Sequence, residues 1–172
     1  MLIIFYNDEK GACTEVSIML IKFAVTLDSC LNNIIYTENG FLKNSRDNTA
    51  VCSLWMGEGT VCLQMDGKSG RVEGLCGSLQ NIQIKEEAFV PLQSFDGAVY
   101  ATSKLPAGII IGYKERGVGY DRNRQVLWFG NPHDGDIIVR VANNLIISLK
   151  DELICGVVVD NIKFEQYYVR HF

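Results

Sequence analysis

The stretch LWMGEGTVCLQMDGKSGRVEGLCG, residues 54–77, carries the strongest indication of fold in this 172-residue chain. Its apolar residues come in short runs, and each run ends at a glycine or at a turn composition such as Asp66-Gly67 or Ser69-Gly70. Short apolar runs bounded in this way are typical of β-strands joined by tight turns. The stretch therefore predicts a strand through Leu54-Trp55 that is followed by a two-stranded hairpin.

A second copy of this pattern lies downstream. The phrase LWFGNP occupies residues 127–132, and Trp55 and Trp128 are the only two tryptophans of the chain. The hairpin-like segment LIISLKDELICGVVV follows at residues 145–159. Corresponding positions in the two hairpins are Leu63 and Ile147, Met65 and Leu149, Val72 and Ile154, Gly74 and Gly156, and Leu75 and Val157. We predict an internal repeat of a Leu-Trp-x-Gly strand plus a hairpin, with both indoles packed between sheets. An aromatic platform for sugars or bases is the alternative that stays open.

The rest of the chain also reads as short strands. Asn39-Gly40 suits the primed turn of a hairpin over residues 33–44. Residues 15–28 fit both a helix and a strand, and their β-branched side chains favour the strand. Further strand candidates are LIIFY (2–6), IQIKEEAFV (82–90), GAVYATS (97–103), GIIIGYK (108–114) and DIIVRV (136–141). We expect one all-β domain over residues 1–172, an antiparallel β-sandwich or partly closed barrel with at most one short helix.

Composition and charge restrict the class of protein. Apolar residues make up 48% of the chain, charged residues 21%, and the formal net charge is -4, which argues against a nucleic-acid partner. No signal peptide and no apolar run of transmembrane length is apparent. The six cysteines have no C-x-x-C spacing and lie mostly in apolar runs. We therefore expect reduced thiols and a cytoplasmic protein that does not contact a membrane.

Catalytic motifs are missing from the sequence. The two histidines are His133, in the loop composition GNPHDGD (130–136), and His171, the penultimate residue. No nucleophile elbow, dinucleotide fingerprint or phosphate loop occurs. We therefore expect a protein that is not an enzyme and that uses no metal and no cofactor. A hydrolase that uses the loop carboxylates Asp121, Asp134 and Asp136 is an alternative that the sequence leaves open.

Charged residues concentrate in the predicted loops. A basic stretch with two tyrosines, YKERGVGYDRNRQ, occupies residues 113–125, and its tip DRNR is typical of a solvated hairpin end. Many acidic residues lie in turn compositions, where they would steer a basic partner toward the protein. The candidate contact residues are Glu58, Asp66, Tyr113, Tyr120, Asp134, Asp136, Asp151 and Glu152. The tyrosines are included as possible aromatic anchors of an interface.

An acidic all-β domain of this size that starts MLIIFYNDEKG (1–11) and lacks a catalytic set resembles one group of bacterial proteins. These are the immunity proteins of contact-dependent growth-inhibition, or polymorphic toxin, systems. The resemblance implies a protein that binds and neutralises one cognate toxin domain, a nuclease, inside the producing cell. A β-sandwich module that binds a small molecule or sugar remains the alternative from a different class.

Overall fold

The fold is known from a computed structural model that describes residues 3–7, 13–18, 21–46, 52–56, 60–80, 82–102, 110–112 and 117–163. These residues contain seventeen strands and one three-residue 3-10 helix, η1 (Pro132–Asp134). The strands form two large sheets and a two-stranded ribbon, and in the described residues neither sheet closes into a barrel. The predicted all-β fold with at most one short helix is confirmed.

The first sheet has eight strands in the order β2-β1-β12-β6-β7-β8-β5-β4. They are β1 (Ile3–Asn7), β2 (Cys13–Ile18), β4 (Ile35–Glu38), β5 (Phe41–Asn44), β6 (Cys52–Met56), β7 (Val61–Met65), β8 (Val72–Ser78) and β12 (Ile110–Gly112). The β4–β5 hairpin turns through Asn39 and Gly40 at φ 52° and 77°, which confirms the primed turn that the sequence predicts.

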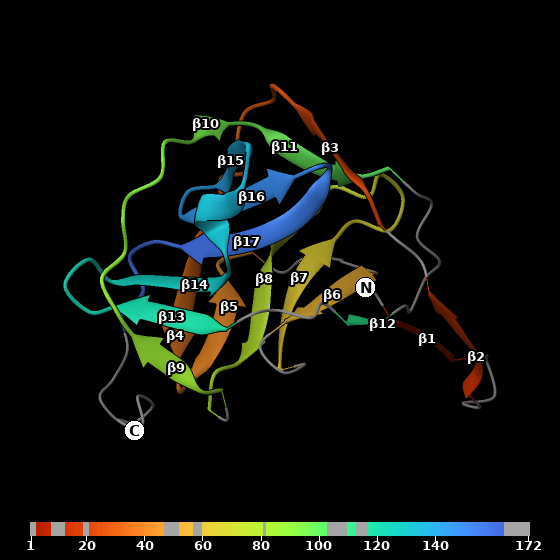
Figure 1. The fold of residues 1–172 in the computed structure, drawn as a ribbon, viewed down its shortest axis with the longest axis horizontal. Coiled ribbons are helices and arrows are strands. Elements are labelled where there is room, and N and C mark those ends of the chain that lie inside the picture. Colours follow the sequence, from red (N-terminus) through yellow and green to blue (C-terminus); the bar gives the residue numbers. More distant parts are fainter. Residues whose placement is uncertain are drawn as a thin grey trace.

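The second sheet has seven strands in the order β10-β15-β16-β17-β14-β13-β9. They are β9 (Ile84–Glu86), β10 (Phe95–Asp96), β13 (Val118–Asp121), β14 (Val126–Gly130), β15 (Ile137–Ala142), β16 (Leu145–Lys150) and β17 (Leu153–Val159). The ribbon pairs β3 (Phe23–Thr26) with β11 (Ala98–Ala101). Figure 1 shows the second sheet in front of the first and the ribbon along the top. Within residues 15–28, residues 15–18 lie in β2 and residues 23–26 form β3, as the β-branched side chains predicted.

Three strand pairings are parallel, two at sheet edges and one inside the first sheet, unlike the purely antiparallel arrangement that the sequence predicts. β12 pairs with β6, β10 with β15, and β9 with β13 in the parallel sense. In each pair the two strands are separated by long intervening segments, which parallel pairing requires and a tight turn cannot supply. Turn composition indicates which strands pair through a tight turn, that is, strands that are neighbours along the chain. Pairings between strands far apart in the chain cannot be predicted from it.

The main core lies between the two large sheets. Leu63, Met65 and Leu75 of the first sheet and Leu127 and Phe129 of the second are all 0% exposed and belong to one cluster. These residues alternate along their strands with residues that point the other way, as a pleated sheet requires. Burial of such side chains from two facing sheets is what holds a β-sandwich together.

The outer face of the second sheet is also covered. Phe89 lies on a crossing segment, defined here as residues 87–92, and packs there with Val126, Trp128, Ile146 and Val158. All five positions of β14 are buried, as are five of the six positions of β16. Burial on both faces explains why VLWFG and LIISL are continuous apolar runs rather than alternating ones.

A buried asparagine links the two sheets. The Asn144 side chain is 4% exposed; its Nδ2 donates to the Ile35 carbonyl at 2.7 Å and its Oδ1 accepts from the Ile35 N–H at 2.7 Å. Nδ2 also donates to the Asp160 carbonyl at 2.8 Å. The side chain thereby satisfies backbone groups at the start of β4 that a loop would otherwise leave buried without partners.

The two hairpins of the predicted repeat share one local feature. In β7–β8 the register shifts after Gln64, which faces Gly74, and in β16–β17 it shifts after Ser148, which faces Gly156. A Cβ at Gly74 would overlap the Asn44 side chain, and a Cβ at Gly156 would overlap Pro132. Each hairpin therefore has a bulge and a glycine at which a residue of another element packs closely, Asn44 of β5 in the first and Pro132 of η1 in the second.

The tryptophan strands of the two copies are placed differently. β6, which contains Trp55, pairs with the first arm of its hairpin, whereas β14, which contains Trp128, pairs with the second arm of the other hairpin. The complete repeat is therefore not confirmed and remains a prediction. The side chain of Trp55 lies outside the described residues.

Trp128 is a core residue and not an exposed platform. Its side chain is 7% exposed, and its ring centroid lies 4.9 Å from that of Phe89. Gly119 faces Trp128 across the β13–β14 pair, and a Cβ there would overlap the indole ring. Gly119 therefore provides the space in which the indole lies.

Replacing Trp128 by alanine should lower the free energy of unfolding by about 3–5 kcal/mol, because a large buried ring is lost and a cavity remains. Gly119→Ala should also destabilise, since its methyl group meets the ring. In Gly119→Ala/Trp128→Ala the methyl group has room, so the double mutant should lose less stability than the sum of the single changes. Urea unfolding followed by circular dichroism measures all three. Strictly additive losses would contradict the packing of the indole on Gly119.

Candidate functional site

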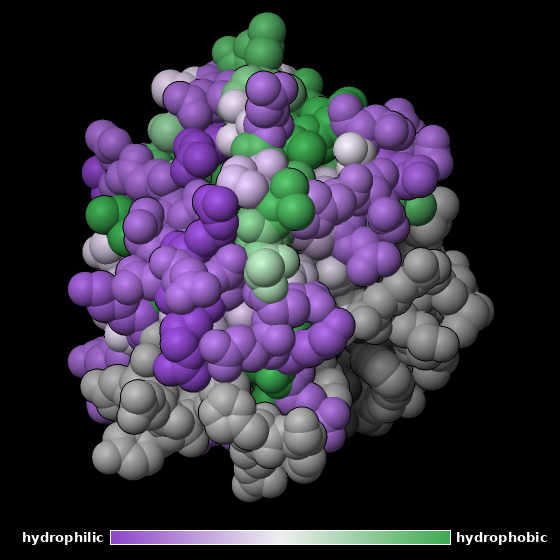
Figure 2. Space-filling view, turned by 60° about the vertical axis from the view of Figure 1, so that its left-hand side comes forward, coloured by the Kyte–Doolittle hydropathy of each residue, from purple (hydrophilic) through white to green (hydrophobic). Residues whose placement is uncertain are grey.

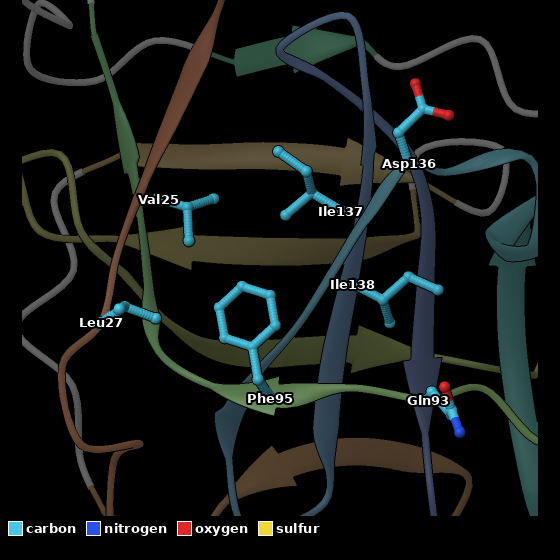
Figure 3. Close-up of a pocket in the computed structure, with 7 residues that line it drawn as sticks. All are labelled: Val25, Leu27, Gln93, Phe95, Asp136, Ile137 and Ile138. Atoms are coloured by element: carbon cyan, nitrogen blue, oxygen red, sulfur yellow. The ribbon is translucent and has the colours of Figure 1, made fainter.

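An apolar groove lies between the ribbon and the edge of the second sheet. It has a volume of about 410 Å³. It is lined by Val25, Leu27, Gln93, Phe95, Asp136, Ile137 and Ile138. Figure 3 shows the five apolar side chains around a common space, with the Asp136 carboxylate pointing away from them at one end. We call these seven residues the apolar groove.

Short edge strands create this groove. β10 has only two residues, and it pairs with β15 at Val139 and Arg140 alone. Ile137 and Ile138, one step earlier on β15, therefore lie beyond the end of β10 at the sheet edge. Leu27, just after β3, is 87% exposed, and Phe95 and Ile137 are 41% and 44% exposed. Large apolar side chains gathered at a surface are typical of a binding site.

Acidic residues lie at one end of the groove. Asp136 lines the groove, and its backbone N–H donates to the Leu149 carbonyl at 2.9 Å. Asp134 ends η1, a turn that Ser148 holds by donating its hydroxyl to the Pro132 carbonyl at 2.6 Å. Within the described part of the chain, neither carboxylate forms an ion pair with a basic side chain.

The β16–β17 turn brings two further acidic residues to the same end. Lys150 and Leu153 close that hairpin, so that Asp151 and Glu152 lie next to Leu149, the residue that contacts Asp136. Both are exposed and have positive φ, 51° and 64°. Glu152 also forms an ion pair with Lys22 at 2.5 Å, so part of its charge is neutralised.

Asp66 reaches this end of the molecule through a chain of backbone hydrogen bonds. Ala101 donates to the Gly70 carbonyl in the β7–β8 turn, Thr102 to the Lys22 carbonyl, and Phe23 to the Glu152 carbonyl. The Asp66 carboxylate accepts hydrogen bonds from the backbone N–H groups of Lys68 and Ser69 and from the Ser69 hydroxyl within its turn. Five predicted contact residues therefore lie on turns at one end: Asp66, Asp134, Asp136, Asp151 and Glu152.

Tyr120, one of the predicted contact residues, is buried in the structure. It is 3% exposed, and its hydroxyl donates to the Ile162 carbonyl at 2.9 Å inside the protein. Its strand is buried at all four positions, because the basic stretch around it includes a core strand, β13. Tyr120 is therefore not available as a surface anchor. Glu58 and Tyr113 lie outside the described residues.

The apolar residues of the groove were not predicted from the sequence, although Asp136 was. Leu27, Phe95 and Ile137 come from three segments far apart in the chain. Each resembles an ordinary strand residue in its local context. One local feature of the sequence indicated the groove, the two adjacent residues Ile137 and Ile138 directly after Asp136. Adjacent residues of a strand point to opposite faces of the sheet, so one of these two isoleucines faces away from the core when only one face is covered.

Asp121, one of the three carboxylates of the hydrolase alternative, has a structural role. Asp121 is 4% exposed and accepts backbone hydrogen bonds from Phe89 at 2.8 Å, Asn123 at 2.9 Å and Arg124 at 3.0 Å. Its carboxylate therefore anchors the crossing segment and the β13–β14 turn. Among the described residues, no group of three histidine, cysteine, aspartate or glutamate side chains could hold a metal ion.

His133 and two of the cysteines, Cys62 and Cys76, have partners within the fold. The Nε2 atom of His133 is hydrogen-bonded to the Val90 carbonyl at 2.8 Å, and its ring lies 5.0 Å from that of Phe89. Cys62 and Cys76 face each other across β7–β8 as free thiols with their sulfurs 3.2 Å apart. The hydrogen bond from Cys62 lowers the pKa of the Cys76 thiol to about 7.

Asp121 should make stability depend on pH. Hydrogen bonds from the backbone N–H groups of Phe89, Arg124 and Asn123 lower the pKa of its carboxyl below the ordinary value. The native state therefore favours the charged form, and this stabilisation is present above about pH 4 and is lost as the pH falls through the lowered pKa.

Asp121→Asn should reduce the melting temperature at pH 7. The carboxylate accepts three hydrogen bonds through its two oxygens, whereas an amide has one accepting oxygen and an NH2 group that only donates. The difference from the wild type should shrink below about pH 4. Thermal unfolding between acidic and neutral pH measures this. Asp96→Asn, at an exposed site on β10, serves as the control and should leave the melting temperature unchanged. An Asp121→Asn deficit that stays constant with pH would contradict the assignment.

Comparison with known proteins identified no similar sequence or structure. No protein-family model, no curated protein sequence and no solved structure matches the chain. Within its described residues, no helix is long and apolar enough to cross a membrane. The site's own geometry is therefore the basis for any functional conclusion.

Proposed function

We propose that this protein binds another protein at the apolar groove and blocks its activity, as the immunity proteins of polymorphic toxin systems do. The partner would be a cognate toxin domain, a nuclease, in the cytoplasm of the producing cell. The proposal includes no catalytic step and no cofactor. The observation that carries it is the exposure of Leu27, Phe95 and Ile137 around a single groove.

Apolar exposure supports a macromolecular partner. Water in contact with these side chains is unfavourable, and covering them with a partner would recover roughly 25 cal/mol for each Å² of apolar area buried. Figure 2 shows apolar side chains at the top of the molecule and in a narrow strip below, between hydrophilic ones. An apolar centre with a polar surround is the usual anatomy of a protein interface.

The acidic end of the groove supports a basic partner. Asp134 and Asp136 lie in adjacent turns without a basic side chain of the described chain to neutralise them. Nuclease domains bind the phosphates of their substrates and tend to be cationic at the site that does so. Acidic groups beside an apolar contact would increase the association rate, while the apolar contact would determine how slowly the complex dissociates.

The test is co-expression with the C-terminal domain of a toxin encoded next to this protein's gene. Cells that carry both should survive, whereas cells that carry the toxin domain alone should die. Phe95→Ser should abolish or weaken protection, because it removes apolar area from the groove. Phe41→Ser is the matched control, since Phe41 is also 41% exposed but lies on β5 in the other sheet. Equal killing with and without the wild-type protein would show that the proposal is wrong.

Charge reversal tests the electrostatic part separately. Asp134→Lys/Asp136→Lys should slow association with the purified toxin domain by about tenfold or more at low salt, and the difference should shrink in high salt as ions screen the field. Stopped-flow measurement at two ionic strengths provides the rates. Glu38→Lys, on β4, changes one charge away from the groove and should have a much smaller effect. An association rate that does not respond to salt would contradict steering by these carboxylates.

A further inference from the structure

A second cavity, of about 290 Å³, lies on the outer face of the second sheet. Val126 and Ile146 of the sheet and Phe89 and Leu92 of the crossing segment supply its apolar lining. Its size is close to the lower end of the range for small-molecule sites, roughly 300–1,000 Å³. This cavity is separate from the apolar groove, and no residue is shared between them.

The wall of this cavity is held in place at three points. The Phe89 N–H donates to Asp121 Oδ2 at 2.8 Å, and the Phe89 ring packs on Trp128 at 4.9 Å. His133 Nε2 is hydrogen-bonded to the Val90 carbonyl at 2.8 Å. A cavity whose wall is fixed before binding needs little ordering when a ligand enters.

Two arginines line the cavity from different elements. Arg140 lies on β15 directly opposite Ile146 of β16, so its side chain is next to the apolar floor. Its Nη1 atom lies 3.5 Å from Asp160 Oδ2 and donates to the Asn143 carbonyl at 2.9 Å. Arg124 lies in the β13–β14 turn, on the same cavity.

Arg124 has only a distant acidic neighbour. Its Nε atom is 3.9 Å from Asp121 Oδ2, which is too long for a hydrogen bond. Both oxygens of that carboxylate already accept backbone N–H groups. The Arg124 guanidinium therefore lies within ion-pair distance of Asp121 but forms no hydrogen bond with that carboxylate.

The charges around the cavity favour an anion. Two guanidinium groups, those of Arg124 and Arg140, line it against one carboxylate, that of Asp160. Burial raises the pKa of the Asp160 carboxyl above its ordinary value, although the neighbouring Arg140 charge opposes this shift. We propose that this cavity binds a small amphipathic monoanion, a carboxylate whose apolar body lies on Val126, Ile146, Phe89 and Leu92 and whose oxygens accept from Arg124 and Arg140. Guanidinium groups are well suited to carboxylates because their N–H donors match the two oxygens. This inference does not depend on the proposed inhibition of a toxin.

The probes are phenylacetate, its neutral isostere phenylacetamide and the cation phenethylammonium, titrated by isothermal calorimetry to millimolar concentration. Phenylacetate should bind saturably with one site, and it should raise the melting temperature in a concentration-dependent way. Phenylacetamide should bind at least about tenfold more weakly, because it lacks the charge that the two arginines recognise. Phenethylammonium should not bind.

Arg124→Gln should weaken phenylacetate binding by roughly tenfold to a hundredfold, the range for losing a hydrogen bond to a charged group. Arg122→Gln is the matched control in the same turn, since Arg122 pairs with Glu86 and does not line the cavity. Arg122→Gln should bind phenylacetate like the wild type. Leu92→Phe is a second, uncharged variant that fills the cavity and should also weaken binding.

Each result bears on the proposal. It would be overturned by an absence of saturable phenylacetate binding to the wild type, by equal affinity for phenylacetate and phenylacetamide, or by equal losses in Arg122→Gln and Arg124→Gln. Ile137→Ser, in the apolar groove, should leave phenylacetate binding unchanged. Failure of toxin protection together with intact phenylacetate binding would reject the proposed function alone.

Discussion

The second sheet is apolar on both faces, and the rest of the structure depends on covering them. The first sheet covers the inner face through residues such as Leu63 and Met65, and the crossing segment covers the outer face through Phe89. The first cover is a broad sheet, whereas the second is a few residues of irregular chain. Asp121 and His133 compensate for this small size because they fix the backbone of the crossing segment at both sides of Phe89.

Local features of the fold could be predicted because they depend on neighbours in the chain. The primed turn at Asn39-Gly40 and the strands at residues 15–18 and 23–26 follow from turn composition and β-branching. Pairings such as β10 with β15 depend on residues more than 40 positions apart, and no composition signals them. IQIKEEAFV forms only the three-residue strand β9, because the segment then leaves the sheet to cross its outer face.

The acidic residues of the candidate site could be predicted from the sequence, whereas its exposed apolar residues could not. Asp134, Asp136, Asp151 and Glu152 lie in turns as their composition indicates, and strand order then brings these turns to one end. Tyr120 was misjudged because a basic surrounding sequence suggested exposure, while strand β13 buries the ring. Leu27 and Phe95 could not be assigned to a surface, because their exposure depends on how far a neighbouring edge strand extends.

The contact of Trp128 with Gly119 has an evolutionary consequence. The indole occupies the volume that a side chain at position 119 would need, so neither residue can change alone without either a clash or a void. Sequences that descend from this one should therefore keep the glycine and the tryptophan together or lose them together. Since most single changes already lower stability, the path between those two states passes through a weakened intermediate. The pair should consequently persist over long divergence, even where the exposed acidic turns change.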